Sequence, residues 1–581
     1  MTSLAHPTVV GTRVLYAYAT GVSAVPGCPP EHEPAQGCSL AQALAEATAG
    51  DTVALATPGR DGHFVGNWTI ATAGTSSRAP VTIAPAPEVA HPVLDGNEGG
   101  RAGCRTATCD GSVLSIGHRV HVVLKGLTIS NAVTDGAGGG AQNDEGGTLV
   151  VLASTFSDDN ATDGGAIANG DNAGAGTLIV SGSTFSANIA EADGGAIDSA
   201  DNRGEGALSV SGSKFSGNSA DGNGGAIDNG DNAGNGQLSV SASTFADDQS
   251  DAFNTSDDTF VKNPGDGGAI DNGDHDGQGH LSVSASTFSA NSSYANGING
   301  DAGVGGNGGA IDNGDNGGQG TLLVSRSTLV GNIGGHGGAI NNSDSLSVSS
   351  STFSTNIAGF GGGAIDNGRA AAAPCACASI WTSTFTNNLA GGQSSDGPFE
   401  PAWHDLPQGL AFIAANGGAI DNGDGDAGTL EAWSSTFSGN QAFGDGDTID
   451  AGDLGGQTGA GAIWVAANIF DGGCHKVGGT WHDLGYNVGD DRTCLRGTRG
   501  DVSHGASSLA GLAANGGPTQ TMSPLARNPA LGAVPFGTAF SLGGRRIYLC
   551  PATDQRGVRS APGRACDAGA VQVRAAGGGT P

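Results

Sequence analysis

Aspartate is the residue type in this chain with the clearest capacity for chemistry, because it recurs at fixed places in a repeated sequence. A Gly-Gly-Ala-Ile motif is followed by a turn of the form Asp-Asn-Gly-Asp. If the repeats stack, equivalent carboxylates lie about 5 Å apart and repel one another by about 1 kcal/mol per pair in water. Either solvent or a cation must offset that repulsion, and Ca²⁺ is the ion that takes carboxylate and carbonyl oxygens. The candidate metal ligands are Asp198, Asp228, Asp231, Asp271, Asp274, Asp312 and Asp315.

The same aspartates also have a purely structural explanation. Asp and Asn tolerate the left-handed conformation and bond the backbone of their own turn. The sequence therefore leaves two alternatives open, solvated turn caps and Ca²⁺ sites. No cofactor is required by any motif, and Ca²⁺ is the one ion that the pattern suggests.

Acid–base catalysis has only a weak candidate pair, His404 and Asp405, beside Trp403 in a long insertion. A glycosidase needs two carboxylates about 5–10 Å apart. A lyase needs a base with a near-neutral pKa, usually with a cation beside the substrate carboxylate. Basic residues are scarce in the repeats, and no nucleophile triad, phosphate loop or dinucleotide motif occurs in a credible context. We expect a protein that is not an enzyme; the alternative is a polysaccharide lyase or glycoside hydrolase acting on a neutral or basic polysaccharide.

Aromatic side chains are rare, at 5% of the chain, yet several lie in the insertions. Such loops either fold back over the scaffold or form a groove for a ligand. The candidate binding residues are Phe253, Phe260, Tyr294, Phe399, Trp403 and Phe412.

The element that positions these residues is an internal repeat. Gly-Gly-Ala-Ile recurs from Gly164 to Gly417, and each copy is followed by a period-2 segment and then by Ser-Thr-Phe-x-x-Asn. No repeat has a helical period, and one unit cannot close a core alone, so the units must stack Phe on Phe, Ile on Ile and Asn on Asn. Three short strands per repeat predict an all-β, single-stranded parallel β-helix. The spacing from Gly-Gly to Phe is nearly constant, whereas the spacing from Phe to the next Gly-Gly varies, so the insertions concentrate at one corner of the coil.

Composition agrees with this architecture. The chain has 106 Gly among 581 residues, and 56 acidic against 23 basic residues give a net charge of −33. That charge argues against binding nucleic acid or an anionic membrane surface. No stretch approaches 18 apolar residues, so no transmembrane segment is expected.

The cysteine pattern indicates the cellular compartment of the protein. The ten cysteines fall as neighbouring couples, which suits local disulfides in an oxidising compartment. Couples Cys28/Cys38, Cys104/Cys109, Cys474/Cys494 and Cys550/Cys566 are predicted disulfides, whereas Cys375 and Cys377 are close enough in sequence that two free thiols are an alternative. No export signal is recognisable between Met1 and Val10.

The ends of the chain predict caps. Ser39-Leu40-Ala41-Gln42 fits a capping box that opens one short helix, which would cover the first coil. We divide the chain into a flexible N-terminus (1–11), an N-terminal cap with irregular coils (12–145), regular repeats (146–470), a loop-rich, disulfide-containing C-terminal cap (471–572) and a flexible tail (573–581).

Three segments resemble known bacterial families. Cys38-Ser39-Leu40 with Ala49-Gly50-Asp51-Thr52-Val53 resembles the CSLREA-type N-terminal region, although Ala41-Gln42-Ala43 stands where the family has Arg-Glu-Ala. The Gly-Gly-Ala-Ile and Phe-x-x-Asn repeats resemble those of polymorphic outer membrane proteins, which are adhesin-like. Four C-terminal motifs resemble the choice-of-anchor Q region: Asp483-Leu484-Gly485-Tyr486-Asn487, Asn515–Thr521, Asp554-Gln555-Arg556-Gly557 and the closing Cys566-Asp567-Ala568-Gly569-Ala570.

What the resemblance implies is a right-handed parallel β-helix that is exported and either released or held at the cell surface. It supplies no catalytic residue. We therefore expect an extracellular or cell-surface monomer whose partner is a polysaccharide or a cell-surface ligand, bound through the side that carries the loops.

Overall fold

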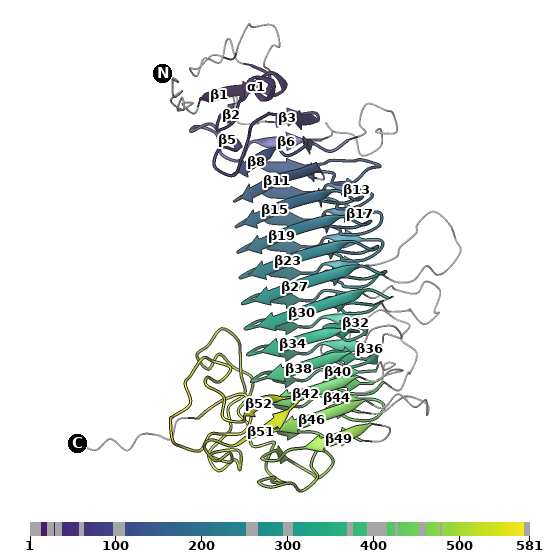
Figure 1. The fold of residues 1–581 in the computed structure, drawn as a ribbon, viewed down its shortest axis with the longest axis vertical. Helices are drawn as coiled ribbons and strands as arrows, with labels where there is room; N and C mark the ends of the chain where they lie inside the picture. Colours follow the sequence, from purple (N-terminus) through teal and green to yellow (C-terminus); the bar gives the residue numbers. More distant parts are fainter. Residues whose placement is uncertain are drawn as a thin grey trace, which may run out of the picture.

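The computed structural model describes residues 13–19, 28, 38–56, 63–96, 111–143, 145–250, 265–293, 306–315, 317–368, 376–391, 415–423, 428–451, 461–476 and 479–573. These residues form one elongated stack of coils, with the N-terminal elements at one end and β49 at the other (Figure 1). Almost every ladder is parallel, and each coil supplies one strand to each of three long sheets. The predicted parallel β-helix is confirmed.

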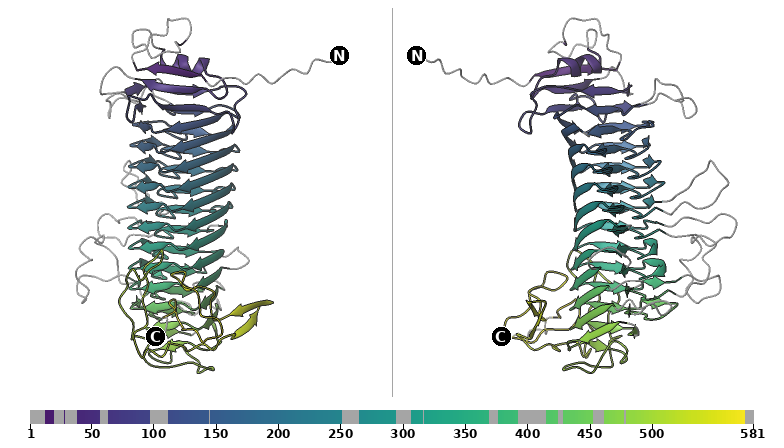
Figure 2. Two further views of the ribbon diagram at one scale, coloured as in Figure 1. Left: turned by 90° about the vertical axis from the view of Figure 1, so that its left-hand side faces the viewer. Right: turned by 45° about the vertical axis from the view of Figure 1, so that its right-hand side comes forward.

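Sheet A contains the longest strand of each coil, and its outer face is uncovered over the middle of the stack (Figure 2). Its strands are β1 (Val14–Tyr18), β2 (Thr52–Ala56), β5 (Val81–Pro85), β8 (His121–Lys125), β11 (Glu145–Leu152), β15 (Ala175–Ser181), β19 (Glu205–Ser211), β23 (Asn235–Ser241), β27 (Gln278–Ser284), β30 (Gln319–Ser325), β34 (Ser345–Ser349), β38 (Cys377–Trp381), β42 (Thr429–Trp433), β46 (Ala462–Ala466) and β49 (Thr480–Asp483).

Sheet B carries the Phe column. Its strands are β3 (His63–Val65), β6 (Val93–Asp95), β9 (Thr128–Ser130), β12 (Thr155–Ser157), β16 (Thr184–Ser186), β20 (Lys214–Ser216), β24 (Thr244–Ala246), β28 (Thr287–Ser289), β31 (Thr328–Val330), β35 (Thr352–Ser354), β39 (Thr384–Thr386), β43 (Thr436–Ser438), β47 (Ile469–Asp471) and β50 (Val488–Gly489).

Sheet C carries the Ile-Asp-Asn segments. Its strands are β4 (Trp68–Ile70), β7 (Leu114–Ile116), β10 (Ala141–Asn143), β14 (Ile167–Asn169), β18 (Ile197–Ser199), β22 (Ile227–Asn229), β26 (Ile270–Asn272), β29 (Ile311–Asn313), β33 (Ile340–Asn342), β37 (Ile365–Asn367), β41 (Ile420–Asn422), β45 (Ile449–Asp450) and β48 (Cys474–His475).

Two short ladders between sheets B and C are an addition that the repeat did not predict. One consists of β13 (Asn160–Ala161), β17 (Ile189–Ala190), β21 (Ser219–Ala220) and β25 (Gln249–Ser250). The other consists of β32 (Ile333–His336), β36 (Ile357–Gly361), β40 (Leu389–Ala390) and β44 (Gln441–Ala442).

The core is built from like residues stacked in register, as the spacing predicted. Phe185 pairs with Phe215 on sheet B, and Ile197 pairs with Ile227 on sheet C. The rings of Phe185 and Phe215 stack with their centroids 4.8 Å apart. Each of these side chains is fully buried, so the coils share one continuous apolar core.

The Gly-Gly pair is required by the backbone. Gly194 has φ +66°, and a Cβ there would lie 2.4 Å from the carbonyl oxygen of Ile197. A Cβ on Gly195 would lie 2.2 Å from the carbonyl oxygen of Gly225 in the next coil. Any other residue would push neighbouring coils apart, which explains why this pair recurs in the repeat.

The N-terminal end has the predicted helix. α1 (Leu40–Glu46) begins after Ser39, whose hydroxyl accepts a hydrogen bond from the Gln42 backbone N–H at 3.3 Å. Leu40, Ala43 and Leu44 face the core. Because α1 lies at the open end of the stack (Figure 1), it covers apolar surface that the first coil would expose.

The C-terminal cap packs beside the last coils (Figure 2). It contains one antiparallel hairpin, β51 (Ala539–Leu542) and β52 (Arg545–Tyr548), and otherwise few strands. Gln555 joins cap to coil: its amide donates to Thr352 Oγ1 at 2.8 Å and its carbonyl accepts from Thr384 Oγ1 at 2.6 Å. The predicted loop-rich cap is confirmed.

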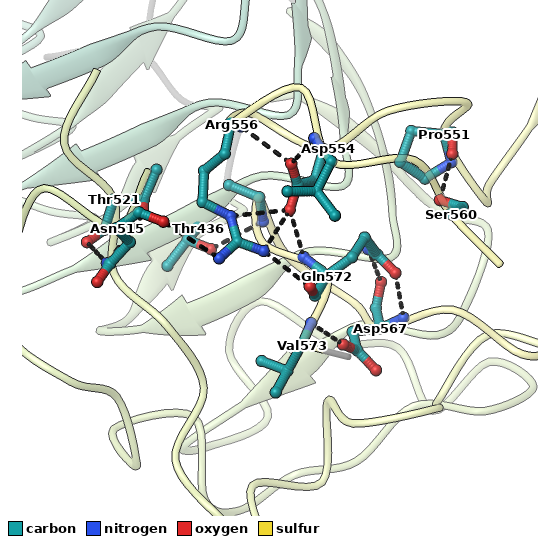
Figure 3. A network of polar contacts seen from close by, with 12 residues as sticks. Thr436, Asn515, Thr521, Pro551, Asp554, Arg556, Ser560, Asp567, Gln572 and Val573 are labelled. Carbon is teal, nitrogen blue, oxygen red and sulfur yellow. Dashed lines mark hydrogen bonds and ion pairs between the residues drawn. The ribbon is translucent and has the colours of Figure 1, made fainter. Parts of the chain in front are cut away.

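The C-terminal motifs meet within this cap (Figure 3). Arg556 forms an ion pair with Asp554 at 2.7 Å and donates to the carbonyl oxygen of Gln572 at 2.8 Å. Gly569 (φ +87°) packs so closely on the coil that a Cβ would lie 2.6 Å from Ile469 Cδ1. Contacts between residues that are distant in sequence therefore stabilise the fold of the cap and its packing on the coils.

Three of the predicted disulfides are present, Cys28–Cys38, Cys474–Cys494 and Cys550–Cys566. Cys377 is also disulfide-bonded, so the alternative of a free thiol there is wrong. Cys104 and Cys109 lie outside the described residues.

Candidate functional site

The inner aspartate column lies on sheet C. Asp198 pairs in register with Asp228, and Asp228 with Asp271. All three side chains are 0% exposed, and neither carboxylate oxygen of any of them has a hydrogen-bond partner. Burial raises the pKa of each well above its ordinary value, and neighbouring aspartates raise it further. The alternative of solvated turn caps is therefore wrong for this column.

Two further columns flank the inner one. The following column lies on the Asn-Gly-Asp turn and consists of Asp171, Asp201, Asp231, Asp274 and Asp315. The preceding column lies directly before Gly-Gly and consists of Asp163, Asp193, Asn223, Asp266 and Asn307.

Hydrogen bonds join the preceding column to the following column beside the inner one. Asn223 Nδ2 donates to Asp231 Oδ2 at 3.0 Å, and Asn307 Nδ2 donates in the same way to Asp315. Burial and nearby aspartates raise the pKa of Asp193 to about 8 and that of Asp201 to about 6. The polypeptide thus holds several carboxylates out of water, where an isolated negative charge is costly.

Two groups of these carboxylates have the spacing of a cation site. The first group is Asp163, Asp198 and Asp201, and the second is Asp201, Asp228 and Asp231. In each group one oxygen per residue lies within 4.8 Å of the others. Oxygens bound to the same Ca²⁺ at 2.3–2.6 Å are at most about 5 Å apart, so both groups fit one ion each.

A third group already contains a positive side chain. His275 Nδ1 lies 3.1 Å from Asp274 Oδ2 and 3.4 Å from Asp231 Oδ1. Hydrogen bonds to Asp231 and Asp274 raise the pKa of His275 to about 11, so the ring is an imidazolium at neutral pH. This group is therefore a weaker cation site than the other two.

Toward the C-terminal end, other side chains contact the inner column. Asn341 Nδ2 donates to Asp312 Oδ1 at 2.7 Å. His336 Nδ1 lies 3.0 Å from Asp366 Oδ2, and His475 Nδ1 lies 2.8 Å from Asp450 Oδ1. The uncompensated carboxylates are thus concentrated at Asp198, Asp228 and Asp271.

The seven aspartates that the sequence suggested as metal ligands have different surroundings in the structure. Asp198, Asp228 and Asp231 join the two cation-sized groups, while Asp274 contacts His275. Sequence reasoning missed Asp163 and Asp193, although an Asp directly before Gly-Gly was a visible signal. It missed them because nothing in the sequence tells on which side of the strand that turn folds.

The corner of the coil that carries the insertions is described by the residues on either side of each insertion. Insertions 251–264, 294–305 and 392–414 each begin after the short ladder and end just before Gly-Gly. Gln249 pairs with Ser292, and Gly361 with Asn416, so the flanks follow the stacking of the coils. The candidate binding residues Phe253, Phe260, Tyr294, Phe399, Trp403 and Phe412 lie outside the described residues, as do His404 and Asp405.

The exposed face of sheet A is a second surface that could take a ligand. A shallow hollow of about 510 Å³ crosses β15 to β30 there. It is lined by uncharged side chains, among them Ile179, Gln237, Ser239, His280 and Leu323. Among the residues that line this hollow, only His280 has a side chain suited to acid–base chemistry.

The chain matches no known family model and none of the curated proteins. Among solved structures it is similar to a GH136 lacto-N-biosidase from Eubacterium ramulus, with 11% identity and a TM-score of 0.35. That similarity covers 65% of this chain and 64% of the other, so the chain spans less than two thirds of that protein.

A second similar structure is a complex of XylC with xylose, with 9% identity and a TM-score of 0.34. The similarity covers 96% of this chain and 98% of the other. Neither match defines a family or an activity for this chain.

Within the described part of the chain, no helix is long and apolar enough to cross a membrane.

Proposed function

We propose that this chain is an exported β-helix protein, released or held at the cell surface, that binds a glycan or another cell-surface ligand through its loop-bearing corner. The observation that carries the proposal is that three insertions of different length replace the same short turn of the coil. In repeat proteins, insertions on one side of the stack are commonly the binding face. The disulfides support export, because such bonds persist in oxidising compartments.

The resemblance to CSLREA-type, polymorphic outer membrane and choice-of-anchor Q sequences supports the same function. The net charge of −33 favours a neutral or basic glycan over an acidic one, since like charges repel. We expect a monomer with no affinity for nucleic acid.

Deleting one insertion provides a direct test. In a coil without an insertion, Ala190 is joined to Gly194 by Glu191-Ala192-Asp193. Removal of residues 392–414 leaves Ala390-Gly391-Ala415-Asn416-Gly417, which has the same length and a similar sequence. The shortened chain is therefore expected to fold, and on a glycan array it should lose binding at least tenfold.

Changes on sheet A supply the control. Gln237→Ala and Ser239→Ala alter exposed side chains of β23 and should leave binding unchanged. Binding that survives the deletion but is lost in the β23 variants would overturn the proposal and place the ligand on sheet A.

The alternative function is a carbohydrate-active enzyme on the same scaffold. Reducing-end and lyase assays on neutral and basic polysaccharides would detect it. Turnover by the full chain that disappears in a His404→Ala/Asp405→Ala double variant would favour the enzyme over the binding protein.

A further inference from the structure

We propose that the aspartate columns hold a row of at least two Ca²⁺ ions inside the scaffold, one bound by Asp163, Asp198 and Asp201, the next by Asp201, Asp228 and Asp231. Asp201 would bridge the two ions. This inference does not depend on the proposed ligand, because the carboxylates lie on the coil and not in the insertions.

The first support is that the inner carboxylate of each group, Asp198 in one and Asp228 in the other, has no other counterpart. Asp198 and Asp228 are 0% exposed, and all four of their carboxylate oxygens are without hydrogen-bond donors. Within the described residues, no Lys or Arg forms an ion pair with the five aspartates of the two groups. The one basic side chain that contacts any of these five within the described part of the chain is His275, whose ring lies 3.4 Å from Asp231. A buried carboxylate without a partner is costly, so a proton or a cation must neutralise it, and a Ca²⁺ ion in each group would serve several carboxylates at once.

The second support is charge and geometry. The two groups contain five carboxylates, and two Ca²⁺ ions would neutralise four of their five negative charges. Oxygens within 4.8 Å of one another fit a shared ion, and a carboxylate can bind Ca²⁺ through one or both oxygens.

The ligand set favours Ca²⁺ over other common divalent ions. Zn²⁺ prefers Cys and His ligands, and neither group contains one. Mg²⁺ demands near-ideal octahedral geometry at 2.0–2.1 Å and usually keeps several waters. A set of mostly buried carboxylates on successive coils suits the larger ion with its flexible coordination.

The column itself shows which variants will fold. Asn341 occupies the inner position next to Asp312, and Ala168 occupies it next to Asp198. The coil therefore accepts a neutral residue there, and Asp228→Asn should keep the fold. Asp247→Asn is the matched control, because Asp247 is exposed on a turn outside the columns and the variant has the same change in charge.

The experiment measures the metal directly. Mass spectrometry of the purified chain counts the bound metal, and calorimetry after dialysis against EGTA measures rebinding of CaCl₂, with MgCl₂ and ZnCl₂ as comparisons. We expect two or more Ca²⁺ per chain, an affinity at least tenfold weaker for one ion in Asp228→Asn and for two in Asp201→Asn, and no change in Asp247→Asn.

Three results would overturn the proposal. One is a wild-type chain that neither contains nor rebinds Ca²⁺. Another is an Asp228→Asn variant, folded by circular dichroism, that binds Ca²⁺ as tightly as Asp247→Asn. The third is a site that takes Mg²⁺ or Zn²⁺ more tightly than Ca²⁺.

Discussion

Asp248 interrupts a ladder of buried asparagines, and replacing it with Asn should stabilise the protein. In the other coils the Asn amide donates twice, as Asn218 does to Phe185 O at 3.2 Å and to the next side chain at 2.8 Å. Asp248 is fully buried; its Oδ1 accepts from Asn218, but its Oδ2 has no partner. An Asn at this position would restore both donations, to Phe215 and Asn291.

The magnitude follows from the pKa of Asp248. Burial raises this pKa from 3.8 to about 7, against the opposing effect of the hydrogen bonds from Asn218. Because the folded pKa exceeds the unfolded one, the free energy of unfolding is greatest below about pH 4, declines as the pH rises to 7 and is constant above it. A shift of about 3 pKa units corresponds to about 4 kcal/mol, which Asp248→Asn would recover at pH 8.

Thermal unfolding followed by circular dichroism at pH 4, 6 and 8 measures this effect. For a chain of this size, about 1 kcal/mol corresponds to about 1 °C in Tm. The Tm gain of Asp248→Asn should therefore grow to about 4 °C at pH 8 and be much smaller at pH 4. Asp247→Asn, with the same charge change on an exposed residue, should stay within about 0.5 kcal/mol of wild type. A gain that is absent at pH 8, or that does not increase with pH, would refute the reasoning.

Three further predictions concern the stack and its cap. Phe215→Ala removes a ring between Phe185 and Phe245 and should cost about 3–5 kcal/mol, seen as a lower Tm. Gln555→Ala breaks the contacts with Thr352 and Thr384; limited proteolysis should then cut within residues 490–573 while the coils stay intact, and unchanged cleavage would contradict the anchoring role. Replacing Cys474 and Cys494 by Ser opens a loop with a sequence separation of 20, and by the chain-entropy relation should cost about 3 kcal/mol in chemical denaturation. The control compares wild type and variant again under reducing conditions, where this difference should disappear.

The sequence determined the register of the coils because identical residues must stack. The Phe and Ile columns, the Asn ladder and the capping helix after Ser39 all followed from spacing and local chemistry. The short ladders such as β13 and β17 did not, because two-residue strands carry no periodic signal.

The site was less predictable than the fold. Asp198 and Asp228 were recognised as stacked carboxylates, but their burial depends on how the turns on either side fold over the strand. That path is fixed by the positive φ of residues such as Gly194 and by the Asn223–Asp231 hydrogen bond. Neither can be deduced from a sequence in which Asp and Gly are abundant everywhere, so solvated and buried turns look alike.

Along the inner column, some buried carboxylates have a neutral or basic side chain beside them and others have only further carboxylates. This difference argues that their burial is not accidental. Near the C-terminal end, Asn341 of the same column donates a hydrogen bond to Asp312. The rings of His336 and His475 lie within hydrogen-bond distance of two further members of the column. At Asp198 and Asp228 the neighbouring positions supply more carboxylates instead. A scaffold that needed only turns could use Asn at these places, as it does at Asn341. The aspartates that remain therefore concentrate negative charge where Ca²⁺ would join successive coils, next to the corner from which the insertions leave.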